Sequence, residues 1–319
     1  MDIEMEYVYA VYQERSFSKA AQKMFVSQSA VSAMVRKAEA SIGCQIFDRS
    51  TIPFSVTEEG RFYLDGIEKI KSIERNMNAF FNDANQLNTG HLSIGSSSFY
   101  CAYFLARMVK AFKKKYPGVH IDIREGGGLE LRQWLLDETI DFLFGATLSD
   151  DPDFQRTLFT QEHLVLGVPA EYSVNEKLKN YQISAEMVGQ NLFLDEKVPA
   201  VPLWEMREHT FILLKKEGSD LHQRGIDICR NAGFVPIVDQ QLDQVLTAYY
   251  MAASGAGVTF FRSSLMNMVG GTKELVYYKV GDSLATRPIY FTQKKGRYET
   301  KAMRAFLDLV GTLPRLYRQ

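Results

Sequence analysis

The apolar residues of the first 57 positions recur at helical spacing in short runs, and the runs are separated by residues that begin or end helices. Met5, Val8 and Tyr12 lie three or four positions apart, which predicts a helix over residues 3–14. The pattern breaks after this helix, and Ser18 is a candidate N-cap for the next one. The chain is therefore expected to begin with two short helices in close succession.

A third helix follows a tight turn at 25–26. Ser27 is its candidate N-cap and Gly43 its end. Its apolar stripe consists of Ala30, Val31, Met34, Val35 and Ala38. Residues 46–56 then resemble a short hairpin. Three helices followed by a hairpin predict a winged helix-turn-helix domain over residues 1–57.

A much longer helix is predicted over residues 58–90. Thr57 is its candidate N-cap, and Glu58 and Glu59 place negative charge at the positive end of the helix. The apolar residues alternate at spacings of three and four, as in a coiled-coil seam: Ile70, Ile73, Met77, Phe80, Ala84 and Leu87. Because no neighbouring element is available to cover this face, we expect the helix to pair with a second copy of itself. Packing on its own domain is the alternative.

From residue 91 onward, strands alternate with helices. The first set of elements is expected, in chain order, at 91–94, 104–115, 120–124, 129–137 and 140–144. Such alternation predicts right-handed crossovers in a mainly parallel sheet. A second set begins at 164–168, and the last segment returns to the first set. We therefore expect two α/β lobes in residues 91–319, with lobe one at 91–163 and 269–319 and lobe two at 164–268.

Length and composition narrow the class of protein. The chain has 319 residues, 46% of them apolar, which suits two or three domains with real cores. No run approaches the roughly 18 apolar residues of a membrane span, and the first residues are acidic, unlike the basic flank of a signal peptide. A cytoplasmic location without membrane contact is expected. The net charge of −1 does not itself favour nucleic-acid binding, so any basic surface must be confined to one face.

The cysteines and histidines indicate neither a disulfide framework nor a metal site. Cys44, Cys101 and Cys229 are odd in number and far apart. The five histidines show no metal-ligand spacing, so no cofactor or metal is expected. Cys101 lies near a predicted helix start, which lowers the pKa of a thiol. A buried, inert thiol is favoured because no resolving cysteine lies nearby in the sequence.

The third helix carries side chains suited to reading DNA. Glutamine and arginine match the adenine and guanine edges, and serines at a helix start hold phosphates. The candidate DNA-binding residues are Ser27, Gln28, Ser29, Ser32 and Arg36, with Arg49 at the base of the wing. The alternative is an ordinary solvated helix face.

The same stretch resembles the LysR-type regulator family. The match runs from Ser16-Phe17-Ser18-Lys19-Ala20-Ala21 through Ser27-Gln28-Ser29-Ala30-Val31-Ser32 and continues through residues 43–60. It is dense over residues 1–65, and weaker but collinear at 164–169 and 255–259. The chain departs from the family pattern at Ser29, where proline is usual, and at Ala38 and Ile46, where leucine is usual. These departures leave the base preference open.

The resemblance implies an α+β multidomain protein. Its parts are a winged helix-turn-helix, a long linker helix and a two-lobed α/β effector domain like that of periplasmic binding proteins. The implied function is sequence-specific transcription regulation, not catalysis, with a small-molecule effector as the control. The implied partners are double-stranded DNA at a pseudo-palindromic promoter site and further copies of the chain, as a homodimer or homotetramer. RNA polymerase is a further candidate partner.

The effector is expected where strand ends and helix starts from both lobes meet. The candidate residues are Ser96, Ser97, Ser98, Gly127, Thr147, Lys215, Ser219 and Thr259. Their hydroxyls, amides and ammonium group predict a polar or anionic small molecule. Simple helix capping is the alternative for the serines.

Three other classes of function are considered. A solute-binding protein needs an export signal and leaves residues 1–88 unexplained. An enzyme needs a nucleophile–base pair or a metal set, and no sequence-local signature of either is evident. A DNA-binding protein whose C-terminal domain only oligomerises stays open, because the sequence does not identify an effector.

Overall fold

The computed structural model describes residues 1–50, 53–83, 90–146, 151–215 and 220–313, apart from the side chain of residue 82. The chain forms two compact units, Met1–Ala84 and Asn85–Gln319, and each is described by itself. No helix in the described ranges is both long enough and apolar enough to cross a membrane.

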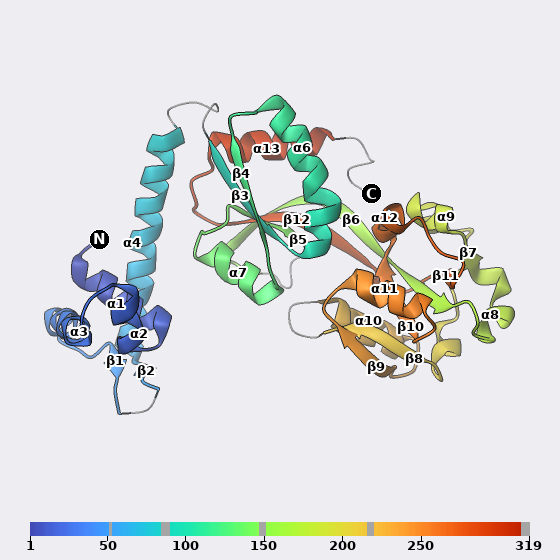
Figure 1. Cartoon of the computed structure of the whole chain (residues 1–319), viewed down its shortest axis with the longest axis horizontal. Helices are drawn as coiled ribbons and strands as arrows, with labels where there is room; N and C mark the ends of the chain where they lie inside the picture. The colour runs from blue at the N-terminus through green and yellow to red at the C-terminus, as the bar shows by residue number, and fades with distance from the viewer. Residues whose placement is uncertain (51–52, 84–89, 147–150, 216–219, 314–319) are drawn as a thin grey trace. The chain divides into compact units, whose positions relative to one another are not determined.

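The first unit is a winged helix-turn-helix followed by a long helix (Figure 1). Its elements are α1 (Ile3–Glu14), α2 (Phe17–Lys23), α3 (Gln28–Ile42), β1 (Phe47–Asp48), β2 (Ser55–Val56) and α4 (Glu58–Asp83). The core is built from apolar residues at helical spacing together with the base of the wing. Its fully buried members include Val8, Val11, Ala20, Val31, Val35, Ile46, Phe47 and Ile67.

The ends of the short helices follow from local capping. The predicted cap Ser18 is wrong: Arg15 ends α1 in the left-handed region (φ 48°), and the extended Ser16 then begins α2. The hydroxyl of Ser16 accepts the backbone N–H of Lys19 at 3.3 Å. Ser27 caps α3, and Gly43 ends it at φ 75°, where a side chain would be strained.

Helix α4 is buried in its first part and exposed further along. Leu64 and Ile67 belong to the core of the first unit. A set of large apolar side chains beyond them is 53–63% exposed: Ile73, Met77, Phe80 and Phe81. The predicted continuation of this seam at residues 84 and 87 lies outside the described residues.

The second unit is a mixed sheet with helices packed on it. Ten strands of the described residues form one sheet, in the order β4-β3-β5-β12-β6-β10-β8-β9, with β11 and β7 branching from β6. The first lobe holds β3 (His91–Ser96), β4 (His120–Glu125) and β5 (Phe142–Gly145). The second holds β7 (Gln182–Ile183), β8 (Thr210–Leu214), β9 (Ile237–Leu242), β10 (Val258–Arg262) and β11 (Leu275–Lys279). Two long strands, β6 (Phe154–Pro169) and β12 (Thr286–Lys294), join the lobes.

Helices cover the faces of both lobes. The first lobe has α5 (Ser98–Tyr100), a π-helical turn (Cys101–Leu105), α6 (Ala106–Lys115), α7 (Gly128–Leu136) and α13 (Lys301–Thr312). The second has α8 (Val174–Lys177), α9 (Ala185–Gly189), α10 (Asp220–Asn231), α11 (Val245–Ala253) and α12 (Met266–Val269). Short 3₁₀ turns lie at Lys179–Tyr181, Leu192–Leu194, Leu203–Met206, Ser263–Leu265 and Ser283–Ala285.

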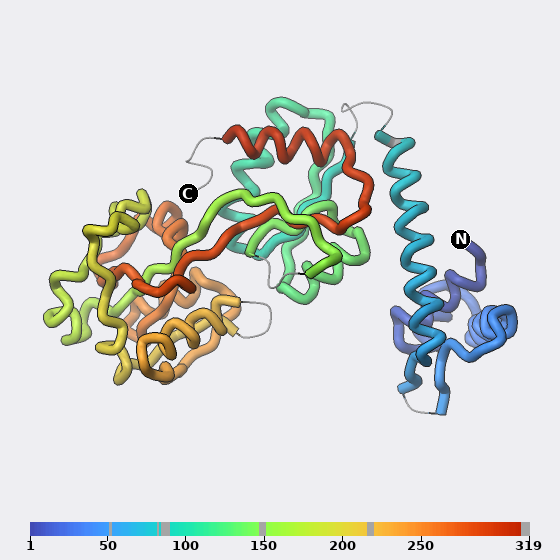
Figure 2. The backbone as a smooth tube through the Cα atoms, turned by 180° about the vertical axis from the view of Figure 1, so that it is seen from behind, coloured from blue at the N-terminus to red at the C-terminus, as the bar shows by residue number. Residues whose placement is uncertain are grey.

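The expectation of a mainly parallel sheet is wrong where the lobes join. Strand β3 is parallel to β4 and β5, and β8 is parallel to β9 and β10, as crossover connections require. Strands β6 and β12 are antiparallel to their neighbours. Strand β6 runs from the first lobe to the second, and β12 runs back from the second lobe to the first. Figure 2 shows the two strands side by side along this passage.

Two predicted boundaries also differ from the structure. The strand expected to begin at Leu164 begins at Phe154, because its first half pairs with β12 and only its second half pairs with β10 and β11. Strand β11 lies in the second lobe, since it pairs with β6 and β7. The return to the first lobe therefore occurs through β12, later than the predicted residue 269.

Candidate functional site

The outer face of α3 is polar and accessible. Val31, Val35 and Ala38 are buried against the rest of the first unit, which turns the opposite face outward. Ser29 and Arg36 are exposed on that face, and Ser32 is half-buried. Gln28 is exposed at the first position of the helix, beside Ser29. The structure therefore gathers the predicted residues of the third helix on one surface.

The start of α3 offers several hydrogen-bond donors. Ser27 Oγ accepts the N–H of Ala30 at 3.2 Å and lies 2.9 Å from Ser29 Oγ. The first N–H groups of a helix have no partners within the helix, and they carry the positive end of its dipole. This end of the 15-residue α3 is thus suited to an anion such as a DNA phosphate.

The two candidate arginines are held differently. Arg36 Nε donates to Ser32 O at 3.2 Å, a bond along its own helix that uses one of five guanidinium donors. Arg49 is engaged within the domain: its Nη2 lies 3.0 Å from Glu39 Oε2, and its guanidinium stacks 4.9 Å from the centre of the Phe17 ring. Glu39, which sequence reasoning did not single out, also accepts the N–H of Ile46 at 3.0 Å and so fixes the base of the wing.

The second unit encloses a cavity of about 430 Å³ between its two lobes. Its walls come from loops at the carboxyl ends of strands, as expected for two-lobed α/β domains. Ser97, Ser98 and Gly127 line it from the first lobe, and Lys215 and Gln244 from the second. Its apolar walls include Phe99, Leu131, Leu135, Phe144, Phe154, Leu214 and Val245.

Two of the predicted effector residues do not reach this cavity. Ser96 is fully buried, and its hydroxyl donates to Phe144 O at 2.6 Å. Thr259 is buried as well, and its hydroxyl donates to Ile212 O at 2.9 Å. Both side chains tie neighbouring strands together, because they point into the sheet packing and not toward the strand ends. Thr147 and Ser219 lie outside the described residues.

The serines that do reach the cavity differ in their bonding. Ser98 Oγ donates to Glu125 Oε1 and accepts the amide of Gln244 at 3.2 Å, so it links the two lobes. Ser97 Oγ is buried, and no group in the described part of the chain gives it a hydrogen bond. A buried hydroxyl without a partner is unfavourable, which makes this atom a natural contact for a bound molecule.

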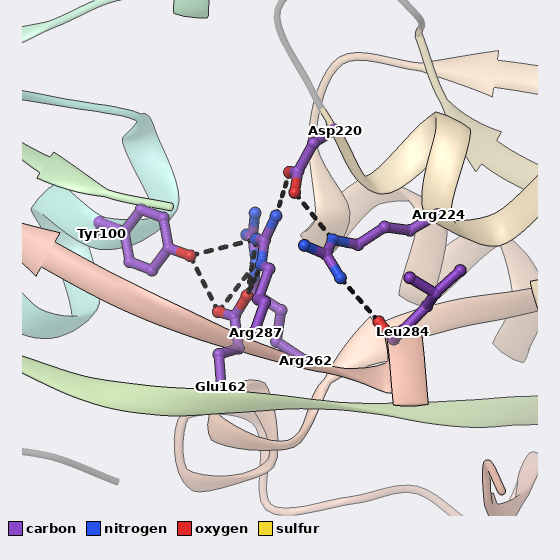
Figure 3. Close-up of polar contacts among 7 residues, drawn as sticks. All are labelled: Tyr100, Glu162, Asp220, Arg224, Arg262, Leu284 and Arg287. Carbon is purple, nitrogen blue, oxygen red and sulfur yellow. Dashed lines mark hydrogen bonds and ion pairs between the residues drawn. The ribbon is translucent and has the colours of Figure 1, made fainter. Parts of the chain in front are cut away.

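A buried ionic cluster forms the floor of the cavity (Figure 3). Arg287 on β12 is the central member: its Nε donates to Glu162 Oε2 on β6 at 2.6 Å, and its Nη1 pairs with Asp220 on α10. Arg262 on β10 lies 3.1 Å from Glu162 as an ion pair. Tyr100 on α5 donates its hydroxyl to the same carboxylate at 3.0 Å.

The cluster also reaches outward along α10. Arg224 pairs with Asp220 at 2.9 Å and donates to Leu284 O at 2.9 Å (Figure 3). Sequence reasoning named Tyr100 only as an apolar wall of the cleft and named none of the charged residues of the cluster. The cluster residues come from five separate elements, and no local pattern connects them.

Burial and neighbouring charges shift the pKa values of two members of the cluster, Arg287 and Asp220, in directions that favour their charged forms. Burial acts to lower the pKa of Arg287, but Glu162, Tyr100 and Asp220 outweigh it and raise that pKa well above the usual value. Burial likewise acts to raise the pKa of Asp220, and Arg287 and Arg224 reverse the effect and lower it. Three guanidinium groups (Arg224, Arg262, Arg287) thus face two carboxylates, leaving an excess of one positive charge.

Burial raises the thiol pKa of two cysteines, Cys101 and Cys229. Burial, with a smaller effect of Glu125, raises the pKa of the Cys101 thiol to about 11. Burial raises the pKa of Cys229 to about 12. In the described ranges, no group of three or more His, Cys, Asp or Glu side chains is placed to hold a metal ion.

Comparison with known proteins places this architecture. Residues 4–61 match the family described as "Bacterial regulatory helix-turn-helix protein, lysR family", and residues 85–314 match the "LysR substrate binding domain" family. The chain is 29% identical to the HTH-type transcriptional regulator YcgK of Bacillus subtilis (strain 168), covering 97% of this chain and 94% of that one. It is 25% identical to the HTH-type transcriptional regulator BenM of Acinetobacter baylyi, covering 90% and 87%.

Solved structures share the fold. Full-length OxyR from Pseudomonas aeruginosa has a TM-score of 0.64 at 19% identity and covers 97% of this chain and 94% of that one. Full-length CbnR complexed with its target DNA has a TM-score of 0.58 at 17% identity and covers 97% and 99%. With a helix-turn-helix at one end and a two-lobed domain around a cavity at the other, this chain belongs to the LysR family of transcriptional regulators, which combine a DNA-binding and an effector-binding domain.

Proposed function

We propose that this regulator reads operator DNA with the outer face of α3 and that an anionic or polar small molecule in the inter-lobe cavity controls the binding. The observation that carries the proposal is the polar surface of α3, where Gln28, Ser29 and Arg36 are exposed close to the N-terminus of the helix. These side chains suit base edges and phosphates. The cytoplasm of a bacterium is the compartment in which such a regulator meets DNA.

The contacts divide into two kinds. Ser27 and Ser29, with the first N–H groups of α3, are assigned to a phosphate and so set the orientation on the duplex. Gln28, Ser32 and Arg36 are assigned to base edges in the major groove. The solved structure of CbnR complexed with its target DNA, which shares the fold of this chain, supports this assignment. Arg49 is assigned to the duplex backbone or minor groove only if DNA displaces its bond to Glu39.

The charge of the cavity floor supports an anionic effector. The cluster holds three guanidinium groups and two carboxylates, and a positive charge that the protein does not balance is stabilised by an anion. A carboxylate or phosphate beside Arg262 and Arg287 would balance it. The buried hydroxyl of Ser97 offers a further donor, and a cavity of about 430 Å³ lies in the size range of small-molecule sites.

The exposed face of α4 supports a homodimer. Ile73, Met77, Phe80 and Phe81 form an apolar stripe on a 26-residue helix, and a second copy of the same stripe would cover it. Two copies of α3 related by a two-fold axis would read a pseudo-palindromic site. A tetramer is a pair of such dimers, and RNA polymerase is a partner at the promoter.

The test is DNA binding at several salt concentrations, with wild type, Arg36→Ala and the matched control Arg61→Ala, which removes an exposed charge from α4. The probes are the upstream intergenic DNA of the gene and a random duplex. We expect wild type to prefer the upstream DNA and to weaken steeply with salt. Arg36→Ala should lose about 1–3 kcal/mol of that preference, while Arg61→Ala should keep it. Equal binding of both probes by wild type, confirmed by genome-wide selection, would refute the DNA-reading assignment.

The effector is tested on the same complex. Anionic metabolites are screened for a shift in operator affinity, and by linkage the operator must shift the affinity of the hit by the same factor. A regulator whose second unit only oligomerises would respond to none of them.

A further inference from the structure

The turn between α2 and α3 contains an aromatic residue in an unusual state. Phe25 has φ 56°, in the left-handed region that large L-residues rarely adopt. Its side chain is 95% exposed, the highest value among the large apolar side chains described. Both properties are unfavourable for a phenylalanine in water.

The fold uses the backbone of Phe25 and not its ring. The N–H of Phe25 donates to Gln22 O at 3.2 Å, and the next N–H, that of Val26, donates to Ala21 O at 3.0 Å. These bonds close the turn and would form with any residue that tolerates positive φ, such as glycine or asparagine. The exposed ring of Phe25 therefore does not contribute to the stability of the fold. A strained and exposed residue of this kind indicates a function.

The position of Phe25 indicates which function. It lies two residues before Ser27, the N-cap of α3, on the same end of the helix as the exposed Gln28 and Ser29. In helix-turn-helix proteins, the N-terminal end of the recognition helix, which corresponds to α3 here, contacts base edges in the major groove. The apolar feature of that groove is the 5-methyl group of thymine, which phenylalanine is able to cover.

We propose that Phe25 is a specificity-determining residue whose ring packs on a thymine methyl group of the operator. The proposal rests on the DNA-reading role assigned to α3. The left-handed backbone projects the ring away from the domain core, and the contact with DNA removes its apolar surface from water. The residue thus adds an apolar contact beside the polar ones of Gln28 and Arg36.

The experiment uses the full chain and a duplex that wild type selects from a pool of random sequences. The variants are Phe25→Asn, which relieves the backbone and removes the ring, and Phe25→Tyr, which keeps the ring. Phe62→Ala is the control, since it removes another exposed phenylalanine (84%) from the same unit. Each thymine of the duplex is replaced in turn by deoxyuridine, which lacks only the methyl group.

We expect Phe25→Asn to melt no lower than wild type and to bind the selected duplex about tenfold more weakly. The slope of affinity against salt should not change, because an apolar contact displaces no counterions. Phe25→Tyr and Phe62→Ala should bind like wild type. One deoxyuridine position should weaken wild type and leave Phe25→Asn unaffected.

Each other result overturns the assignment. Equal affinity of wild type and Phe25→Asn, equal losses in Phe25→Asn and Phe62→Ala, or no methyl position specific to the Phe25 ring would show that the ring does not read thymine. If wild type selects no sequence at all, the DNA-reading role of α3 fails together with this proposal. If wild type selects a sequence and only the Phe25 tests fail, the role of α3 stands.

Discussion

The surface of α3 and the floor of the cavity use polar side chains in opposite ways. On α3, Gln28 and Arg36 are exposed, and Arg36 donates a hydrogen bond to Ser32 O of its own helix. In the cavity floor, Arg287 is 2% exposed and is already paired with Glu162 and Asp220. One surface therefore leaves its donors available in water, whereas the other holds Arg287 in buried ion pairs before any ligand arrives.

Because of this difference, substitutions on α3 and in the buried cluster should affect different properties: recognition of a partner in the first case and stability in the second. Changing an exposed residue of α3 alters contacts with a partner and leaves the folded unit nearly unchanged. Changing a member of the buried cluster removes a partner from a desolvated charge, so it acts on folding first. The predictions below test how far the two regions can be treated in this way.

The largest expected effect is that of Glu162→Gln. This carboxylate accepts the Tyr100 hydroxyl and pairs with Arg262 and Arg287, so its loss leaves two buried guanidinium groups with less counter-charge. We expect the second unit to lose about 3–5 kcal/mol of its free energy of unfolding. Both tryptophans of the chain, Trp134 and Trp204, lie in that unit, so urea unfolding followed by their fluorescence reports on it alone.

Asp227→Asn is the matched control for this substitution. Asp227 and Arg230 form an exposed ion pair at 3.1 Å on α10, with side chains 37% and 55% accessible. Its loss should change the free energy of unfolding by about 0–1 kcal/mol. Similar losses in both variants would mean that the buried cluster contributes no more than a surface pair.

Adjacent serines provide the second test. Ser97→Ala removes a buried hydroxyl that has no partner in the described residues, so the free energy of unfolding without ligand should stay constant or rise by up to about 1 kcal/mol. The response to the effector should weaken about tenfold if this hydroxyl donates to an anionic group.

Ser96→Ala should do the reverse. It removes the bond to Phe144 O and leaves that buried carbonyl without its donor, at a cost of about 1–3 kcal/mol of unfolding free energy. The effector affinity, measured on the folded protein by calorimetry, should stay unchanged. A loss of effector affinity in Ser96→Ala and none in Ser97→Ala would contradict the placement of the two side chains.

The smallest expected effect concerns Cys101. Because burial raises its thiol pKa to about 11, almost none is ionised near neutral pH, and the thiolate fraction should grow about tenfold per pH unit up to that value. We expect peptide mapping to find Cys101 unmodified by iodoacetamide at neutral pH. Rapid alkylation there, or peroxide-dependent DNA binding lost in Cys101→Ser, would show that the thiol is a sensor.

The same contrast explains how much the sequence could predict. The DNA-reading face lies within one helix, so the spacing of Val31, Val35 and Ala38 was enough to place Ser29 and Arg36 on the opposite side. Gln28 continues the stripe of Val31 and Val35 and is exposed at the first position of the helix. The cavity floor joins Tyr100, Glu162 and Arg287, which meet only after the lobes have formed, and no periodicity relates them.

Some errors were avoidable. Leu92, Ile94 and Ser96 alternate along β3 and share one of its two buried faces, so period two already places Ser96 in the packing of the sheet and separates it from Ser97. The first half of β6 was not predicted because its buried residues, Phe154, Phe159 and Glu162, do not recur with period two, and most of the residues between them are polar, as in a loop. Its partner strand β12 lies more than 110 residues further along the sequence, so no local pattern could predict the pairing.

The course of β12 has a consequence for the order of events on the ribosome. Tyr290 pairs with Gly145, so the first lobe completes its sheet only after the entire second lobe has been synthesised. Phe306 on α13, which stacks 5.3 Å from Phe112, is made later still. At about 5–20 residues per second, the 145 residues from Ala146 to Tyr290 take about 7–29 seconds. During that interval the nascent first lobe exposes an unpaired strand edge, and it is the stage at which a chaperone is most needed.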